Sequence, residues 1–182
     1  MNKIKKILSV IRRKFIKQKI YLNVDSYMNS YTKYLKSIGI NFTGEKKKVK
    51  FIEPSAYFDG HDYTLISIGD NVTISREVML LTHDYSITTA LASIGREAIQ
   101  RHDGELYFLN KISIGDNCFI GARASLLPGT TVGNNCIIGA CSVVKGNIPS
   151  NSIVVGNPAK IIGDTREYAK KHLENEDYKV EK

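Results

Sequence analysis

Apolar side chains recur every sixth residue along most of this chain. An aliphatic residue occupies each such position in two runs: Ile68, Ile74 and Leu80, then Ile114, Ile120, Leu126, Val132, Ile138 and Val144. Small or β-branched residues two positions earlier keep the same period. A helix has a period of about 3.6, and a half-buried strand alternates over a longer stretch. The pattern instead predicts an all-β domain of short strands joined by turns, in which three hexapeptides form one coil of a parallel β-helix.

Residues 18 apart should stack on one another, because three hexapeptides complete a coil and paired strands lie about 4.8 Å apart. Ile114 is therefore expected to stack on Val132, and the same holds for Ile120 on Ile138 and Leu126 on Val144. Cys118 and Cys136 share this spacing, so we expect both in an interior column, where a free cysteine behaves as a small apolar side chain. Gly-Asp-Asn at 69–71 and at 115–117 is typical of the tight turns between such strands.

The two runs of hexapeptides are out of register, since Leu80 and Ile114 are 34 residues apart. Residues 84–111 lack the repeat and contain histidine, charged and aromatic residues. We expect this segment to be a loop that leaves the β-helix. Long loops on a rigid scaffold often carry function.

Both ends of the chain have helical patterns in place of the repeat. In residues 3–20 apolar side chains recur at helical spacing: Ile4, Ile7, Leu8, Ile11 and Phe15. Lysine and arginine cover much of the remaining surface of this predicted helix. Its apolar side either packs on the end of the β-helix or on a neighbouring subunit, or it adsorbs to an anionic membrane surface.

Two further helices are predicted. One runs from an N-cap at Asp25 to Gly39 and presents tyrosines to the core. The other covers about 165–176, where Asp164 and Glu167 resemble a capping box. We expect this last helix to cover the open end of the β-helix, because uncovered strand edges are a liability.

The positive charge is concentrated in the first quarter of the chain. Residues 1–50 hold 14 Lys/Arg against two acidic residues, whereas residues 51–182 hold 12 against 16. An acidic remainder argues against a nucleic-acid function, which would need basic surface around the working site. The run Lys46-Lys47-Lys48 is interpreted as a solvated turn that enters the first coil.

Composition and cysteine usage favour a single cytoplasmic domain. The chain has 182 residues, of which 42% are apolar and 24% charged, as in ordinary globular proteins. No apolar run approaches the roughly 20 residues that span a bilayer, and no signal peptide is recognisable. Three cysteines do not suggest a disulfide framework, so a reducing cytoplasm is expected.

Several motifs are more specific than the period alone: Ile66-Ser67-Ile68-Gly69-Asp70-Asn71, Thr82-His83-Asp84, residues 112–121, Pro128-Gly129 and residues 155–160. Together they resemble the hexapeptide-repeat acyltransferases, and most of all the bacterial sugar O-acetyltransferases of exopolysaccharide, capsule and lipopolysaccharide pathways. The resemblance implies a left-handed β-helix, a homotrimer, and acetyl-CoA as acyl donor. We therefore expect three segments: a basic helical segment (1–50), an acyltransferase β-helix (51–162) and a terminal helix (163–182).

His83 is the predicted catalytic residue. Acyl transfer to a hydroxyl needs a base, and histidine suits that role because its unperturbed pKa is about 6.5. His83 lies where the β-helix gives way to the loop, at the place of the family's catalytic histidine. The resemblance implies that it takes the hydroxyl proton during direct attack on the thioester, without an acyl-enzyme. The sequence does not reveal which group orients its ring.

Candidate binding residues also follow from the resemblance. Coenzyme A is expected along a groove between two subunits, near Gly121, Ala122, Ala140, Ser142, Lys145, Asn157, Pro158 and Lys160. Galactoside-type relatives carry a serine in the stretch matching Phe119–Ala122, where it can stabilise the oxyanion. Ala122 here implies that a backbone N–H does so. The acceptor is expected to meet Asp84, Tyr85 and Arg101 at the loop.

Other functions remain open. An N-acetyltransferase acting on a nucleotide-linked amino sugar is the main alternative, and a non-catalytic β-helix scaffold is another. A metal hydratase with this type of fold would need three well-placed histidine ligands, and His61, His83 and His102 do not show that pattern, so no metal is expected.

Overall fold

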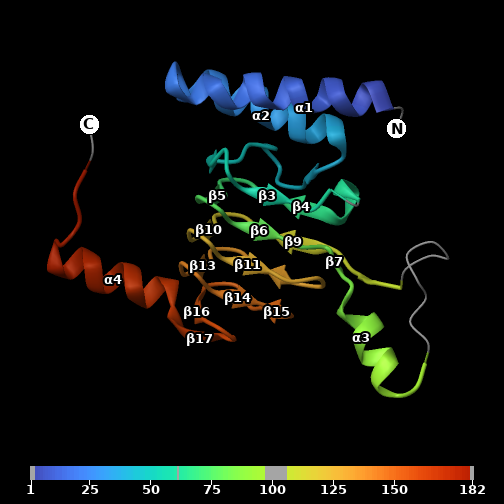
Figure 1. The fold of residues 1–182 in the computed structure, drawn as a ribbon. Helices are drawn as coiled ribbons and strands as arrows, with labels where there is room; N and C mark the ends of the chain where they lie inside the picture. The colour runs from blue at the N-terminus through green and yellow to red at the C-terminus, as the bar shows by residue number, and fades with distance from the viewer. Residues whose placement is uncertain (1–2, 61, 97–105, 181–182) are drawn as a thin grey trace.

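The computed structural model describes residues 3–60, 62–96 and 106–180. Most of the chain winds into a parallel β-helix with three faces, and two helices lie across its N-terminal end (Figure 1). Sheet A contains β1 (Asn41–Phe42), β4 (Ile66–Ile68), β9 (Ile112–Ile114), β12 (Thr131–Val132) and β15 (Asn147–Ile148). Sheet B contains β2 (Phe51–Ile52), β5 (Thr73–Ile74), β10 (Phe119–Ile120), β13 (Ile137–Ile138), β16 (Ser152–Gly156) and β17 (Ala159–Asp164). Sheet C contains β3 (Tyr57–Phe58), β6 (Met79–Leu80), β11 (Ser125–Leu126) and β14 (Val143–Val144).

The chain passes from sheet A to B to C and back to A in every coil, so the β-helix has three edges. Edge AB holds the turns at 69–72, 115–118 and 133–136, and edge BC holds those at 75–78, 121–124 and 139–142. Edge CA holds 59–60, 62–65, 127–130, 145–146 and the two ends of the long segment between β6 and β9. The edge on which a residue lies decides which other residues it can reach.

The strand register confirms the predicted stacking. Ile114 pairs with Val132, and the other two predicted pairs are also in register. Ile68 pairs with Ile114, 46 residues later. This separation exceeds one coil of 18 residues by 28 residues, which is the length of the segment 84–111. The segment is therefore an insertion between two coils that leaves their stacking intact.

The interior of the β-helix is mainly apolar. Ile120 and Ile138 are completely buried, and Cys118 and Cys136 lie in the same interior, as predicted. All three cysteines are free thiols. Burial of each large aliphatic side chain stabilises the fold by about 1.5–3 kcal/mol relative to exposure.

The turns of edge AB depend on asparagine and glycine for different reasons. Asn71, Asn117 and Asn135 adopt the left-handed conformation, with φ of 54°, 56° and 56°. Their side chains form a ladder in which each Nδ2 donates to the next Oδ1, at 2.9 and 3.1 Å. Gly115 is needed for close approach instead, because a Cβ there would lie 2.3 Å from Asn134 Oδ1 in the next coil.

Helix α2 (Val24–Ile38) closes the N-terminal end of the β-helix. Its tyrosines are buried as predicted, and the Tyr27 hydroxyl donates to the Ile52 carbonyl at 2.7 Å. The predicted N-cap at Asp25 is wrong: Asn23 caps the helix, and its side chain accepts from Ser26 N at 2.7 Å. Asn23 is favoured because its backbone is still extended, whereas residue 25 already lies inside the first turn.

Helix α1 (Lys3–Gln18) lies on the outer side of α2 and is followed by the short 3-10 helix η1 (Lys19–Tyr21). Ile16 is buried, but the other apolar side chains described in this helix are 44–68% exposed: Ile7, Leu8, Val10, Ile11 and Phe15. The apolar side of α1 is therefore largely uncovered within this chain. No helix in the described part of the chain has the length and apolarity to cross a bilayer.

The inserted segment is not an irregular loop throughout. It begins with β7 (His83–Asp84), continues into α3 (Ser86–Ser93), and returns as β8 (Phe108–Leu109), which pairs antiparallel with β7. Without a hexapeptide repeat, these short elements had no periodic signal that could reveal them.

The C-terminal end is closed differently from the expectation. Asp164 does cap helix α4 (Thr165–Asn175), although its side chain accepts from Arg166 N at 2.8 Å. Helix α4 has no buried residue and projects away from the β-helix (Figure 1). Strand β17 instead folds back antiparallel on β16 and extends sheet B. With α-helices of 16, 15, 8 and 11 residues, the chain is not all-β.

Candidate active site

His83 lies on edge CA, at the point where the chain leaves the β-helix. Strand β6 ends at Leu80, and β7 then carries His83 outward. One coil earlier, β3 ends at Phe58, which pairs with Leu80, so Asp59 follows at the same edge. This register brings a histidine and a carboxylate together although they are 24 residues apart.

Asp59 fixes both the backbone and the ring of the histidine segment. Its Oδ2 accepts hydrogen bonds from Thr82 N at 2.9 Å, Thr82 Oγ1 at 3.0 Å and His83 N at 3.1 Å. The same oxygen is in hydrogen-bond contact with His83 Nδ1. Asp59 is only 1% exposed, whereas the side chain of His83 is 25% exposed. A buried carboxylate thus holds a ring that remains accessible.

The charge state of Asp59 determines the tautomer of His83. Burial acts to raise the pKa of Asp59, but the hydrogen bonds from Thr82 and His83 outweigh it, and the net pKa is lowered. An ionised carboxylate can only accept, so His83 Nδ1 carries a proton and donates to Asp59. In the neutral form of the ring Nε2 then carries the lone pair that a general base requires.

Two tyrosines from the inserted segment flank the His83 ring. The Tyr85 ring lies 5.0 Å from the histidine ring and the Tyr107 ring 6.3 Å, both nearly perpendicular to it. The two tyrosines are 5.2 Å from each other. Pairing of β7 with β8 brings Tyr107 back to the position where the segment began.

Asp84 points its carboxylate toward the start of α3. Its Oδ1 accepts from Ser86 N at 2.8 Å. Hydrogen bonds from Ser86 lower the pKa of Asp84, and the positive charge of Lys145 adds to this effect. Lys145 lies on edge CA two coils away, so the predicted coenzyme residue and the predicted acceptor residue are close enough to interact electrostatically.

The other predicted coenzyme residues lie on edge BC or at the β16–β17 hairpin: Gly121, Ala122, Ala140, Ser142, Asn157, Pro158 and Lys160. Gly121 is pressed against the next coil, and buried Ser142 accepts from Gly156 N at 3.1 Å. Ala122 is half-buried and Ala140 exposed, so small side chains are open at this edge. Within one chain, however, edge BC and His83 on edge CA are separate.

Sequence reasoning missed Asp59, and three residues that it considered are not described by the structure. A signal for Asp59 was present in the pairing of the Phe58 and Leu80 positions. Arg101, His61 and His102 lie outside the described residues. Across residues 3–60, 62–96 and 106–180, no three metal-ligating side chains gather as a cation site would need.

The repeat resembles that of known transferases. Residues 111–146 match the family profile described as bacterial transferase hexapeptide (six repeats). Protein CapG of Staphylococcus aureus is 40% identical over 119 residues, which are 65% of this chain and 64% of CapG. Galactoside O-acetyltransferase of Escherichia coli K12 is 38% identical over 120 residues, which are 66% of this chain and 53% of that protein.

A solved structure agrees over a longer stretch. A galactoside acetyltransferase in complex with coenzyme A superposes with a TM-score of 0.60 at 28% identity, covering 96% of this chain and 88% of the other. The sequence alignments span less than two thirds of CapG and of the galactoside enzyme. The resemblance to hexapeptide-repeat acyltransferases is confirmed, and the parallel sheets with N-terminal helices fit their left-handed β-helix.

Proposed function

We propose that this chain, which carries the hexapeptide repeat of bacterial transferases, is an acetyl-CoA-dependent O-acetyltransferase that acts on a sugar hydroxyl in surface polysaccharide biosynthesis. The observation that carries the proposal is the pair of His83 and buried Asp59 at the edge where the inserted segment begins. A scaffold would have no need for an accessible histidine held by a buried carboxylate.

In the proposed mechanism His83 Nε2 takes the proton of the acceptor hydroxyl as that oxygen attacks the acyl carbonyl. Asp59 keeps Nδ1 protonated and stabilises the positive charge that the ring gains, as the aspartate of other histidine bases does. Acetyl-CoA supplies the acyl group when bound: the ester C–O bond forms, the thioester C–S bond breaks, and coenzyme A leaves as a thiol with the proton that His83 returns. A backbone N–H stabilises the oxyanion, because Ala122 has no hydroxyl to offer.

The acceptor meets the inserted segment in this proposal. Tyr85 and Tyr107 form an aromatic wall beside His83, and Asp84 and Arg101 supply charged and hydrogen-bonding groups. Tyrosine suits a sugar because its ring contacts C–H groups while its hydroxyl binds hydroxyls. The residues of this segment would then select the acceptor, while the β-helix supplies the base.

A homotrimer completes the site. The exposed small residues of edge BC cannot meet His83 within one chain, whereas edge BC of one copy can face edge CA of another. Apolar side chains on the outer faces are available for such contact, since Tyr57, Met79 and Phe119 are each at least 39% exposed. Lys145 and Lys160, both exposed, are the cations proposed for the coenzyme phosphates.

A complementation experiment tests the shared site. His83→Ala and Ala140→Trp are each expected to abolish activity alone, the second by filling the coenzyme groove. Co-expression of the two variants should restore a fraction of activity, because some mixed trimers contain one intact site. Two inactive variants that stay inactive together, although native mass spectrometry shows mixed trimers, would contradict a site built from two copies.

The proposal places the enzyme in the cytoplasm at the inner face of the membrane. The uncovered apolar residues of α1 lie among cations, and residues 3–18 include seven Lys/Arg and no acidic residue. Such a helix can bury its apolar side among lipid headgroups. Replacing exposed Ile11 and Phe15 by serine should reduce sedimentation with anionic vesicles, and unchanged sedimentation would remove this part of the proposal.

The decisive experiment measures coenzyme A release with acetyl-CoA and a panel of sugars, nucleotide sugars and amino sugars. His83→Ala should lower turnover at least about a hundredfold, the loss usual for a catalytic base. The matched control is His172→Ala. His172 also contacts an aspartate, Asp177, but it lies on α4. Product mass distinguishes an ester from the amide of the alternative N-acetyltransferase. If His83→Ala turns over as fast as wild type, the general-base role is wrong.

A further inference from the structure

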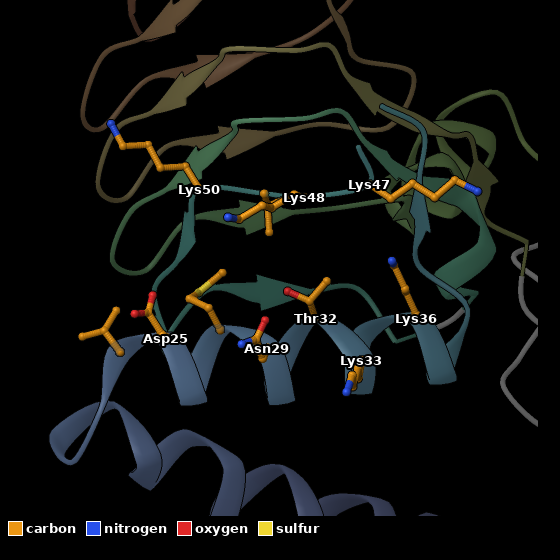
Figure 2. A pocket seen from close by; sticks show the side chains of 11 residues that line it. Asp25, Asn29, Thr32, Lys33, Lys36, Lys47, Lys48 and Lys50 are labelled. Atoms are coloured by element: carbon orange, nitrogen blue, oxygen red, sulfur yellow. The ribbon is translucent and has the colours of Figure 1, made fainter. Parts of the chain in front are cut away.

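A groove lined by lysines lies between helix α2 and the first turn of edge AB, residues 44–50. Its volume is about 560 Å³, in the range of small-molecule sites. Figure 2 shows the two walls of the groove. Lys50, Lys48 and Lys47 follow one another along the turn 44–50, and polar residues of α2 line the opposite side. The helix residues share one face of α2, because they follow helical spacing: Asp25, Asn29, Thr32, Lys33 and Lys36.

The groove collects positive charge that nothing described in the chain neutralises. Five lysines line it against a single carboxylate, that of Asp25. None of the five forms an ion pair with a described residue; the ammonium of Lys36 lies 5.3 Å from the ring of Phe42 instead. Lys36 and Thr32 point from α2 toward the turn 44–50, while Lys47 and Lys50 extend at the two ends of the groove (Figure 2).

Nearby acidic residues do not cancel this charge. An adjoining depression shares Lys48 and Lys50 and includes Asp70 and Asp116. The Asp70 carboxylate accepts backbone N–H bonds from Lys46 and Lys48, both at 2.7 Å. Asp116 Oδ1 accepts from Asp70 N at 2.6 Å. Both carboxylates thus hold turns together, and the two depressions combined still have six lysines against three aspartates.

The lining suits a multiply charged anion such as phosphate. Its eleven residues include no arginine, so the planar fork that recognises a single carboxylate is absent, and they include no aromatic ring on which a nucleic-acid base could stack. Lysines are flexible point charges that can converge on a multiply charged group. Asn29 and Thr32 add neutral donors, and buried Val49 with Met28 forms an apolar floor.

We propose that this lysine groove is a second binding site, for a phosphate-bearing anion. It lies on edge AB at the N-terminal end, whereas His83 is on edge CA, so the site is separate from the acyl-transfer chemistry and does not depend on it. The phosphate group can belong to a soluble molecule or to a lipid headgroup. Because α1 also lies at this end of the molecule, both sources are tested.

The soluble arm measures binding of inorganic pyrophosphate to the full chain by calorimetry at low and physiological salt. The variant Lys48→Gln/Lys50→Gln removes two cations at exposed positions. The backbone N–H groups of residues 48 and 50 can still donate to Asp70 and to the Val72 carbonyl. Its affinity for pyrophosphate should fall at least tenfold. The matched control Lys170→Gln/Lys171→Gln changes net charge equally on exposed positions of α4 and should bind as wild type does.

The lipid arm measures sedimentation with phosphatidylglycerol vesicles and with neutral phosphatidylcholine vesicles, using the same variants. Groove-dependent vesicle binding without pyrophosphate binding supports the proposal and assigns the phosphate to a lipid; groove-dependent pyrophosphate binding assigns it to a soluble ligand. Equal losses in the groove variant and the α4 control, or no loss in either arm, would overturn the proposal. Thermal unfolding of each variant establishes that the fold is retained.

Discussion

Replacing Asp59 by asparagine separates the charge of the proposed dyad from its geometry. Four polar contacts with described residues converge on Oδ2 of this side chain, and three of them come from Thr82 and from the backbone N–H of His83. An amide would place its oxygen there, because its NH₂ group cannot accept from these donors. The asparagine oxygen therefore still accepts from His83 Nδ1, and the ring keeps its tautomer while the negative charge is lost.

The size of the effect follows from that difference. A hydrogen bond to a charged group contributes about 1.5–3 kcal/mol and one between neutral groups about 0.5–1.5 kcal/mol. Losing the charge should therefore raise the barrier by about 1–2 kcal/mol, which lowers the rate roughly 5- to 30-fold. A reversed amide would impose the wrong tautomer, with a loss of about 10⁴. We expect Asp59→Asn to fall in the first range, well short of the loss in His83→Ala.

The assay is steady-state kinetics of coenzyme A release with the acceptor found in the panel. The reduction should appear in kcat, with KM for both substrates little changed, because Asp59 acts through the ring. Asp164→Asn, which alters the cap of α4, is the matched control and should leave kcat unchanged. Full activity in Asp59→Asn would refute the positioning role. A loss as large as in His83→Ala, with an unchanged melting temperature, would refute the argument that three donors fix the amide oxygen.

The same variant makes a prediction for stability against pH. The pKa of Asp59 is lowered in the folded protein, so the unfolded chain binds this proton at higher pH than the folded one does. The stabilisation by the carboxylate is thus fully present above about pH 4, the unfolded pKa, and is lost as the pH falls through the lower folded pKa. Urea denaturation should show wild type losing more stability than Asp59→Asn as the pH falls from 6 to 3. A parallel decline would contradict it.

Two packing predictions test the β-helix itself. Gly115→Ala should destabilise the fold by about 1–3 kcal/mol, because the new Cβ would lie 2.3 Å from Asn134 Oδ1. In Gly163→Ala the atom nearest to the new Cβ would be 3.7 Å away, so thermal unfolding of this variant should be nearly unchanged. Ile120→Ala should cost about 2–5 kcal/mol by leaving a cavity in the interior, against less than about 1 kcal/mol for exposed Ile162→Ala in the same urea titration. Equal effects within either pair would contradict the stacking.

The hexapeptide period was sufficient to predict the coils because it records a repeated physical constraint. Each interior position must be apolar and each turn must be tight, so Ile114, Val132 and their equivalents could be placed in register from the sequence. Helix boundaries were less certain, because a cap depends on one backbone conformation. Asp25 is a good N-cap residue by type, yet the extended backbone lies at Asn23. The inserted segment had no period, so β7, α3 and β8 left no comparable signal.

The candidate site was predicted in part for the same reason. His83 was identified from its motif and from its position beside the insertion. Asp59 was not, because no motif links it to His83 and only the stacking of β3 on β6 brings the two together. Tyr85 was predicted to face the acceptor, but its contact with Tyr107 depends on the pairing of β7 with β8. Residues that meet through tertiary register are visible in sequence only after the register is known.

The location of the dyad has a physical explanation in how the coils are held together. On edge AB, polar side chains at the turns are occupied by neighbouring coils: Asp116 Oδ1 accepts from Asp70 N, and Asn134 Oδ1 from Asp116 N. A turn that serves this purpose cannot offer its side chain to a substrate. Edge CA is where the chain leaves the coil, so the carboxylate of Asp59 can hold a side chain instead of only the next turn. At this edge Asp59 therefore holds both the His83 ring, whose side chain stays 25% exposed, and the backbone at the point of departure.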